Sequence, residues 1–191
     1  MQMRLMIAGA AIGGLLAAGA CAPKSDAPPA AGNAAARPAG PGAAAGPSTA
    51  KTDTVKYTDL DGKSFTIGDV PGQVKVVNYW ATWCQPCIKE IPSFNKLHAE
   101  YGPKGVTVIG VSIDENGAED VAPFLKTPRG KMDYRVALAK LEDLEPVGVT
   151  ESIPVTLVYD ASGRLVKRFD GYAEEAALEA AVNAALGAPK G

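Results

Sequence analysis

The 191-residue sequence predicts an α/β fold, in which helices cover both faces of a mixed central sheet. Two segments, 74–80 and 106–113, are rich in β-branched residues, which is typical of strands buried on both faces. A segment of helical periodicity separates them, and a hairpin and a last helix follow later in the chain. Strand–helix–strand units give parallel strands and hairpins give antiparallel ones, so we expect both in the sheet.

The first elements predicted around these strands are a hairpin and a helix. Residues 55–67 are predicted to form a hairpin that turns at Asp61-Gly62, a dipeptide favoured in tight turns. A helix is predicted from Cys84 to about Tyr101, because apolar residues recur every three or four positions along it: Ile88, Ile91, Phe94 and Leu97.

The second half of the chain is predicted to continue the sheet. We expect a short helix over 118–125 and a short strand over 134–138. Residues 155–159 and 164–169 flank a polar turn, which predicts a hairpin. The last predicted helix covers 174–186 and ends before Gly187.

Composition excludes several classes of protein. The 19 basic and 21 acidic residues give a net charge of −2, so the chain lacks the basic field of a nucleic-acid-binding protein. Three cysteines are too few for a disulfide-stapled scaffold or a four-thiolate zinc site. All 12 aromatic residues follow residue 50, so we expect one folded domain over 51–191. We expect the protein to be a monomer.

The N-terminus has the features of an export signal. Arg4 precedes an apolar stretch of about 16 residues that ends at Ala18-Gly19-Ala20-Cys21. Small residues before a cysteine resemble the lipobox of bacterial lipoproteins, which implies a signal peptide over 1–20 and a lipidated Cys21. A plain cleaved signal and an uncleaved anchor are the alternatives. All three place the domain outside the cytoplasm, where disulfides persist.

A tether is predicted between the signal and the domain, over residues 21–50. Of the 29 residues after Cys21, 12 are Ala, 6 are Pro and 4 are Gly, with no aromatic residue to bury. The prolines interrupt any helix, so we expect a disordered linker.

The sharpest motif is Cys84-Gln85-Pro86-Cys87, which directly follows a buried strand and begins a helix. The free N–H groups and the positive dipole end of a helix N-terminus stabilise a thiolate, which should lower the pKa of Cys84 and make it a nucleophile. Cys87 lies one turn into the helix, close enough to attack a mixed disulfide formed at Cys84. Pro86 suits the first helical turn because it has no N–H to lose.

Two other interpretations of the cysteine pair are weaker. A structural disulfide across so short a loop would stabilise little. A metal site would need further ligands, and the candidates are His98, about 21 Å along the helix, and Cys21, beyond the linker. We therefore expect His98 to be a surface residue and the protein to hold no metal.

The sequence around the motif is similar to that of a known family. Residues 76–92, VVNYWATWCQPCIKEIP, resemble the TlpA/ResA-like branch of the thioredoxin superfamily, which consists of membrane-tethered extracytoplasmic thiol–disulfide oxidoreductases. The resemblance covers about 57–186 and includes the hairpin before the motif and a segment around 114–150 that this branch inserts. It implies a thioredoxin-like fold and protein disulfide reductase activity without a cofactor.

Several site residues are implied by the resemblance. Ile153-Pro154 resembles the cis-proline loop that packs beside the dithiol and pairs with the substrate chain, although the sequence alone also fits a proline at a strand entry. Glu90, three residues after Cys87, would assist proton transfer at that thiol, whereas the plain alternative is a solvated glutamate. Asn78 stands where cytoplasmic thioredoxins have a buried Asp.

Three further residues lie in the same segment, residues 76–92. Trp83 would shield the dithiol and offer apolar contact to protein substrates, or else simply pack against the sheet. Gln85 between the cysteines should tune the redox potential. Pro92 resembles the family's helix-kinking proline.

These features predict a periplasmic reductant anchored to the membrane by its lipid. The implied substrates are disulfides of exported proteins, among them the haem-site thiols of apocytochrome c, and a membrane thiol-reductant donor would restore the dithiol. The alternatives are a thiol peroxidase, disfavoured because Thr82 lies only two residues before Cys84, and a copper metallochaperone that uses the cysteine pair.

Overall fold

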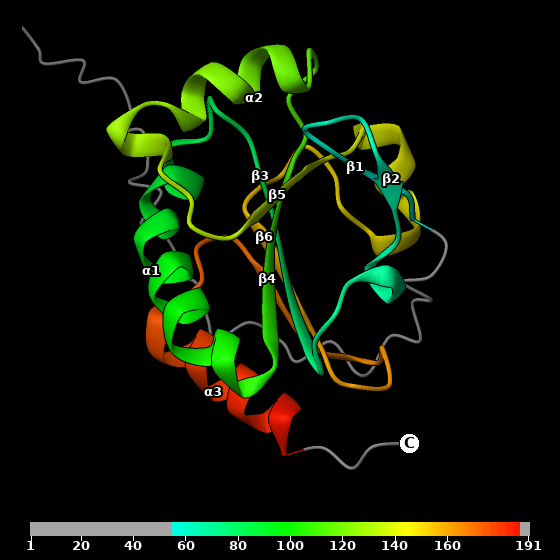
Figure 1. Cartoon of the computed structure of the whole chain (residues 1–191), viewed down its shortest axis with the longest axis vertical. Helices are drawn as coiled ribbons and strands as arrows, with labels where there is room; N and C mark the ends of the chain where they lie inside the picture. Colours follow the sequence, from blue (N-terminus) through cyan, green and yellow to red (C-terminus); the bar gives the residue numbers. More distant parts are fainter. Residues whose placement is uncertain (1–54, 188–191) are drawn as a thin grey trace, which may run out of the picture. The chain divides into compact units, whose positions relative to one another are not determined.

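The computed structural model describes residues 55–187, which form one seven-stranded sheet (Figure 1). The spatial order of the strands is β2-β1-β5-β4-β3-β6-β7. In chain order their bounds are β1 Tyr57–Asp59, β2 Ser64–Phe65, β3 Val74–Trp80, β4 Val106–Ser112, β5 Arg135–Leu138, β6 Val155–Tyr159 and β7 Leu165–Asp170. The predicted strands are therefore present, with ends that shift by a residue or two.

The sheet is mixed, as predicted. Strands β3, β4 and β5 run parallel, because the helices α1 (Gln85–Tyr101) and α2 (Ala118–Leu125) cross between them. Strand β6 pairs antiparallel with β3, and β7 pairs antiparallel with β6. Val77 pairs with Ile109 of β4 on one side and with Leu157 of β6 on the other, so β3 is an interior strand of the sheet.

One face of the sheet is covered by α1 and by α3 (Glu175–Leu186), which lie side by side in Figure 1. Their contact includes hydrogen bonds from Asn183 to Tyr101 and from Ser93 to Glu175. The buried residues on this face come from both helices and from the strands: Val74, Val76, Val108, Val158, Phe94, Leu97, Leu178 and Val182.

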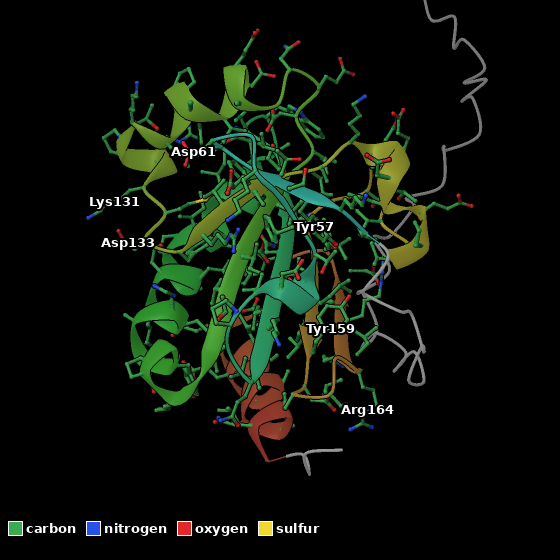
Figure 2. The ribbon with its side chains drawn as sticks, turned by 45° about the vertical axis from the view of Figure 1, so that its right-hand side comes forward. Tyr57, Asp61, Lys131, Asp133, Tyr159 and Arg164 are labelled. Atoms are coloured by element: carbon green, nitrogen blue, oxygen red, sulfur yellow. A yellow bond between two sulfur atoms is a disulfide. The ribbon has the colours of Figure 1, made fainter. Side chains whose placement is uncertain are left out.

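The opposite face is covered by two 3-10 helices, η2 (Ile67–Asp69) and η5 (Leu141–Val147), rather than by long α-helices. Helix α2 lies at the top of Figure 1, near the carboxyl ends of the parallel strands. Tyr57 and Tyr159 are buried within this part of the core, whereas Arg164 extends from its lower edge (Figure 2). The hydroxyls of Tyr57 and Tyr79 are 2.8 Å apart.

The segment around 114–150 contributes to the sheet. It contains α2, the 3-10 helix η4 (Pro128–Gly130), strand β5 and η5. Strand β5 pairs parallel with β4 and antiparallel with β1, so this segment also joins the N-terminal hairpin to the sheet.

The predictions for the N-terminal region lie outside the described residues. These are the signal peptide over 1–20, the lipidated Cys21 and the linker over 21–50. Within 55–187, no helix is both long enough and apolar enough to cross a membrane.

Candidate active site

The turn that leads into the motif is held by Asp114. Strand β3 ends at Trp80, and the backbone N–H and the hydroxyl of Thr82 donate to the Asp114 carboxylate at 3.0 and 2.7 Å. The hydroxyl of Ser112 donates to the same carboxylate at 2.7 Å. Since β3 and β4 are parallel neighbours, their carboxyl ends bring Asp114 beside the turn.

Helix α1 begins directly after Cys84, as predicted. Cys84 is the N-cap residue, and the backbone N–H of Cys87 donates to the Cys84 sulfur at 3.3 Å. Pro86 occupies the first turn, where the helix leaves N–H groups free. One of those N–H groups is thus aimed at the sulfur on which a negative charge is expected.

Cys84 and Cys87 form a disulfide, so the structure shows the oxidised pair. Their Cα atoms are 5.3 Å apart. Cys84 is 5% exposed and Cys87 is 1% exposed, so the pair lies just under the surface with Cys84 on the outer side. This arrangement suits a pair in which a substrate reaches one sulfur first.

The loop before β6 passes close to the disulfide. The Ile153–Pro154 peptide bond is cis, and the carbonyl oxygen of Ile153 lies 3.8 Å from the Cys84 sulfur. Pro154 accepts a hydrogen bond at 2.8 Å from the backbone N–H of Gly171, which follows β7. The structure therefore brings together the dithiol and the proline loop, which are 69 residues apart in sequence.

Glu90 is buried, so the interpretation as a solvated glutamate is wrong. Its side chain is 1% exposed, and its Oε1 accepts a hydrogen bond from the backbone N–H of Ala173. Its Oε2 has no hydrogen-bond partner among the described residues. Burial raises the pKa of Glu90 to about 7, and the Ala173 N–H and the nearby Asn78 amide offset this only in part.

Asn78 lies in the sheet beneath this helix. It is 2% exposed and donates from Nδ2 to the hydroxyl of Thr156 at 3.1 Å, across the β3–β6 pair. It is a neutral polar group that cannot accept a proton from either cysteine.

Trp83 points away from the core. Its side chain is 59% exposed, which contradicts packing against the sheet. It lines a cleft of about 800 Å³ together with Ile113, Asp114, Glu115, Asn116, Asp120, Lys140, Leu141, Glu142 and Glu151. An exposed indole next to the dithiol offers apolar surface to a docking chain.

The structure also shows the surroundings of three other residues for which the sequence made a prediction, Gln85, Pro92 and His98. Gln85 accepts a hydrogen bond at 2.7 Å from Arg129, which links the first turn of α1 to η4. Pro92 lies inside α1, and the helix continues through it to Tyr101. His98 is half-buried rather than on the surface. Within residues 55–187, no group of three or more potential metal ligands gathers.

Sequence reasoning missed three residues at this site. Asp114 fixes the turn before Cys84, Ala173 donates to Glu90, and Tyr172 between Gly171 and Ala173 is 47% exposed. No local pattern identifies them, because Asp114 and Ala173 act through contacts with distant segments, and Tyr172 lies between two residues that make such contacts. The one signal in the sequence was Gly171, a glycine two residues after the predicted strand 164–169, whose φ of 89° favours glycine in this turn.

Comparisons with known proteins show which proteins this chain is similar to. The Redoxin family model matches residues 41–188. The thiol–disulfide oxidoreductase ResA of Bacillus thuringiensis (strain Al Hakam) is 31% identical over 122 residues, covering 64% of this chain and 69% of that protein.

Two solved structures of thiol:disulfide interchange proteins are also similar to this chain. A thiol:disulfide interchange protein DsbE from Chlorobium tepidum superposes with a TM-score of 0.63 at 28% identity, covering 72% of this chain and 96% of that one. A thiol:disulfide interchange protein of the thioredoxin family from Chlorobium tepidum TLS has a TM-score of 0.59 at 30% identity, covering 72% and 97%. These similarities extend over almost the whole described region.

Proposed function

This chain belongs to the Redoxin family and is a TlpA/ResA-like thiol–disulfide oxidoreductase of the thioredoxin superfamily, and we propose that it reduces disulfides of exported proteins through Cys84 and Cys87. The observation that carries this proposal is the cysteine pair itself. It is bonded at the N-terminus of α1, with the Cys87 N–H directed at the outer sulfur, that of Cys84.

The first step is attack by the reduced protein. The Cys84 thiolate attacks one sulfur of the substrate disulfide, so that a bond forms between Cys84 and the substrate while the substrate S–S bond breaks. One substrate sulfur leaves as a thiolate. The backbone N–H of Cys87 stabilises the charge on Cys84 before the attack. We expect the substrate chain to pair with the Ile153–Pro154 backbone, and the 3.8 Å between the Ile153 carbonyl and the Cys84 sulfur supports this.

The second step closes the disulfide seen in the structure. Cys87 attacks the Cys84 sulfur, the Cys84–Cys87 bond forms, and the second substrate sulfur is released. Two electrons thereby pass from the dithiol to the substrate. Glu90 lies one helical turn from Cys87, and with a pKa of about 7 its carboxylate accepts the Cys87 proton and returns it to the released thiolate.

The location and the partners complete the proposal. The domain would act outside the cytoplasm, tethered through a lipid on Cys21 and the linker that follows it. A membrane thiol-reductant donor would return the Cys84–Cys87 disulfide to the dithiol, since that compartment is oxidising. Support comes from the export signal predicted from the sequence, and apocytochrome c is one candidate substrate.

The test is the loss of activity on removal of the nucleophile. Cys84→Ala should lower the rate of reduction of a protein disulfide by dithiothreitol to the rate that dithiothreitol gives without the protein. Cys21→Ser removes the remaining cysteine and should retain full activity, which makes it a matched control. Full activity in Cys84→Ala would overturn the proposal.

Two measurements separate the other functions. Rapid consumption of hydrogen peroxide without a disulfide substrate would favour a peroxidase. Stoichiometric copper binding without redox cycling of the cysteines would favour a metallochaperone.

A further inference from the structure

Four side-chain polar atoms of residues 55–187 are buried without a hydrogen-bond partner among the described residues. Three of them are the indole Nε1 of Trp80, the carboxyl Oε2 of Glu90 and the hydroxyl of Tyr134, and the fourth is Nδ1 of His98. Trp80, Glu90 and Tyr134 are each at most 6% exposed. Since an unpaired buried polar group is costly, each of these three atoms calls for a partner.

Trp80 and Tyr134 meet over Gly110, which lies in β4. Trp80 ends β3 and Tyr134 directly precedes β5, and these two strands pair with β4 on its two sides. A Cβ atom at Gly110 would lie 3.0 Å from Cε2 of Tyr134 and 3.2 Å from Nε1 of Trp80. Because glycine has no side chain, both rings can reach over β4.

Glu90 reaches the same place from helix α1, which covers this face of the sheet. Asn78 is the β3 partner of Gly110 in the sheet register, and its amide acts on the Glu90 carboxyl. Phe94, one turn after Glu90 on the buried face of α1, packs against the ring of Tyr134 with a centroid distance of 6.1 Å. Burial first, and the charge of Glu90 second, raise the pKa of Tyr134 far above its usual value, so the carboxyl lies within electrostatic reach of this hydroxyl.

The segment before Tyr134 is fastened to the same helix. Asn95 of α1 donates from Nδ2 to the carbonyl of Lys131 and accepts at Oδ1 from the N–H of Asp133, both at 2.8 Å. Lys131 and Asp133 accordingly lie beside α1 in Figure 2. These contacts fix the backbone next to Tyr134, so its ring is held between α1 and β4.

The three atoms offer the donors and acceptors that one water molecule requires. The Nε1–H of Trp80 can only donate, the ionised carboxylate of Glu90 can only accept, and the hydroxyl of Tyr134 can do either. A buried water typically makes about three hydrogen bonds to polar groups that lack other partners. A water that accepts from Trp80 and Tyr134 and donates to Glu90 would satisfy all three.

We propose that Trp80, Tyr134 and Glu90 together hold one buried water molecule, and that Tyr134 acts through it as a positioning residue for the Glu90 carboxylate. When Glu90 is ionised, the Tyr134 hydroxyl donates to the water and the water donates to Oε2. When Glu90 takes up a proton, its Oε2–H donates to the water and the Tyr134 hydroxyl accepts. For catalysis this inference rests on the proposed function, in which Glu90 receives the proton of Cys87.

The water favours the ionised form of Glu90, because hydrogen bonds to a charged acceptor are stronger than those to a neutral one. The other influences on Glu90 are burial, which raises its pKa, and hydrogen bonds from Ala173 and Asn78, which lower it; none of the three comes from a charged side chain. Cys84 and Cys87 are bonded to each other in the oxidised protein and do not titrate. Loss of the Tyr134 hydroxyl should therefore raise the pKa of Glu90 further.

The experiment follows the carboxyl carbon of Glu90 by NMR during a pH titration of the oxidised protein, with the signal assigned by its loss in Glu90→Gln. Wild type should titrate with a midpoint of about 7. Tyr134→Phe keeps the ring and removes only the hydroxyl, and it should raise the midpoint by about one pH unit, a tenfold rise in proton affinity. In turnover, the part of the pH dependence that Glu90→Gln abolishes should shift by the same amount in the same direction.

Tyr159→Phe is the matched control, since it removes the same hydroxyl from a buried tyrosine on the opposite face of the sheet. It should leave the midpoint of Glu90 unchanged. Thermal unfolding checks that both variants keep the fold. A crystal structure of the oxidised wild type should show one water within hydrogen-bond distance of Nε1 of Trp80, Oε2 of Glu90 and the hydroxyl of Tyr134.

The outcomes separate this inference from the function on which its catalytic part rests. An unchanged midpoint in Tyr134→Phe, an equal shift in Tyr159→Phe, or the lack of a water that joins the three atoms would overturn the inference. None of these readings depends on disulfide reduction. Wild-type protein that does not reduce protein disulfides, with the midpoint of Tyr134→Phe raised as expected, would overturn the proposed function alone.

Discussion

At the scale of single residues, Glu90 is the group whose chemistry departs most from its ordinary behaviour. Glu90 is spaced three or four residues apart from the buried residues Phe94, Leu97 and Tyr101 in turn, so it lies on the face of α1 that packs against the core. Helical periodicity therefore contained the signal that this glutamate is buried. What periodicity cannot supply is its partner, because Ala173 comes from the other end of the domain.

The buried carboxyl predicts a pH-dependent stability for the oxidised protein. Folded Glu90 keeps its proton up to a pH of about 7, whereas the unfolded chain releases it near 4.5, the ordinary pKa of a glutamate side chain. Between these values the unfolded state binds fewer protons, so the free energy of unfolding falls as pH rises through this window and levels off above it. Glu90→Gln should remove this loss, which amounts to at most about 3 kcal/mol.

The measurement is urea unfolding of oxidised wild type and Glu90→Gln between pH 5 and pH 8. Glu100→Gln, an exposed glutamate of the same helix, is the control and should follow wild type. If the free energy of unfolding changes with pH in the same way for wild type and for Glu90→Gln across this range, the pKa of Glu90 is not raised.

At the scale of elements, the parallel strands β3 and β4 position the dithiol through their carboxyl ends. Asp114 follows β4 and holds Thr82, two residues before Cys84. The turn that presents Cys84 is thus braced from the neighbouring strand rather than by its own residues.

Removal of this brace should affect both stability and activity. Asp114→Ala leaves the Thr82 and Ser112 donors without their acceptor, so we expect the free energy of unfolding to fall by about 2 to 4 kcal/mol. Disulfide exchange should also slow, because Cys84 is less firmly placed. Denaturant unfolding and the rate with glutathione disulfide measure the two effects.

A neighbouring substitution provides the control for Asp114. Glu115→Ala alters an exposed carboxylate that lines the same cleft and should change stability by no more than about 0.5 kcal/mol. If both variants unfold at the same denaturant concentration as wild type, Asp114 does not brace the turn.

The elements themselves were largely predictable, since their signals are local. The β-branched run of β3 and the spacing of apolar residues in α1 match the observed bounds closely. The pairing of β1 with β5 was not predictable, because a three-residue strand carries too little pattern to choose a distant partner. The helix η5 was missed for a similar reason, as a 3-10 segment lacks the 3.6-residue period.

At the scale of the whole molecule, the proposed membrane attachment rests on the sequence of the N-terminal residues, whereas the proposed chemistry rests on the folded domain. The cysteine motif and its place at a helix start were readable from sequence, since the strand, Pro86 and the two cysteines are contiguous. The assembly of Cys84 and Glu90 with Pro154 and Ala173 requires the folded sheet, because the start of α1, the proline loop and the β7–α3 connection are far apart in the chain.

Membrane attachment is predicted to depend on one side chain. In a bacterial host, the wild-type chain should be found in the membrane fraction with an acylated Cys21, detected by fatty-acid labelling. Cys21→Ser should incorporate no label and should lose its stable attachment after export. Labelled protein in Cys21→Ser, or unlabelled wild type, would contradict lipidation at Cys21.

The central claim is that Cys84 attacks and Cys87 resolves, and the most direct measurement is trapping of the mixed disulfide. Reduced Cys87→Ser should form a long-lived adduct with an oxidised polypeptide, and mass spectrometry should locate the bond at Cys84. Reduced Cys84→Ser should form almost none, since Cys87 is 1% exposed. Adducts at Cys87 in Cys84→Ser, or no adduct with Cys87→Ser, would contradict the assignment.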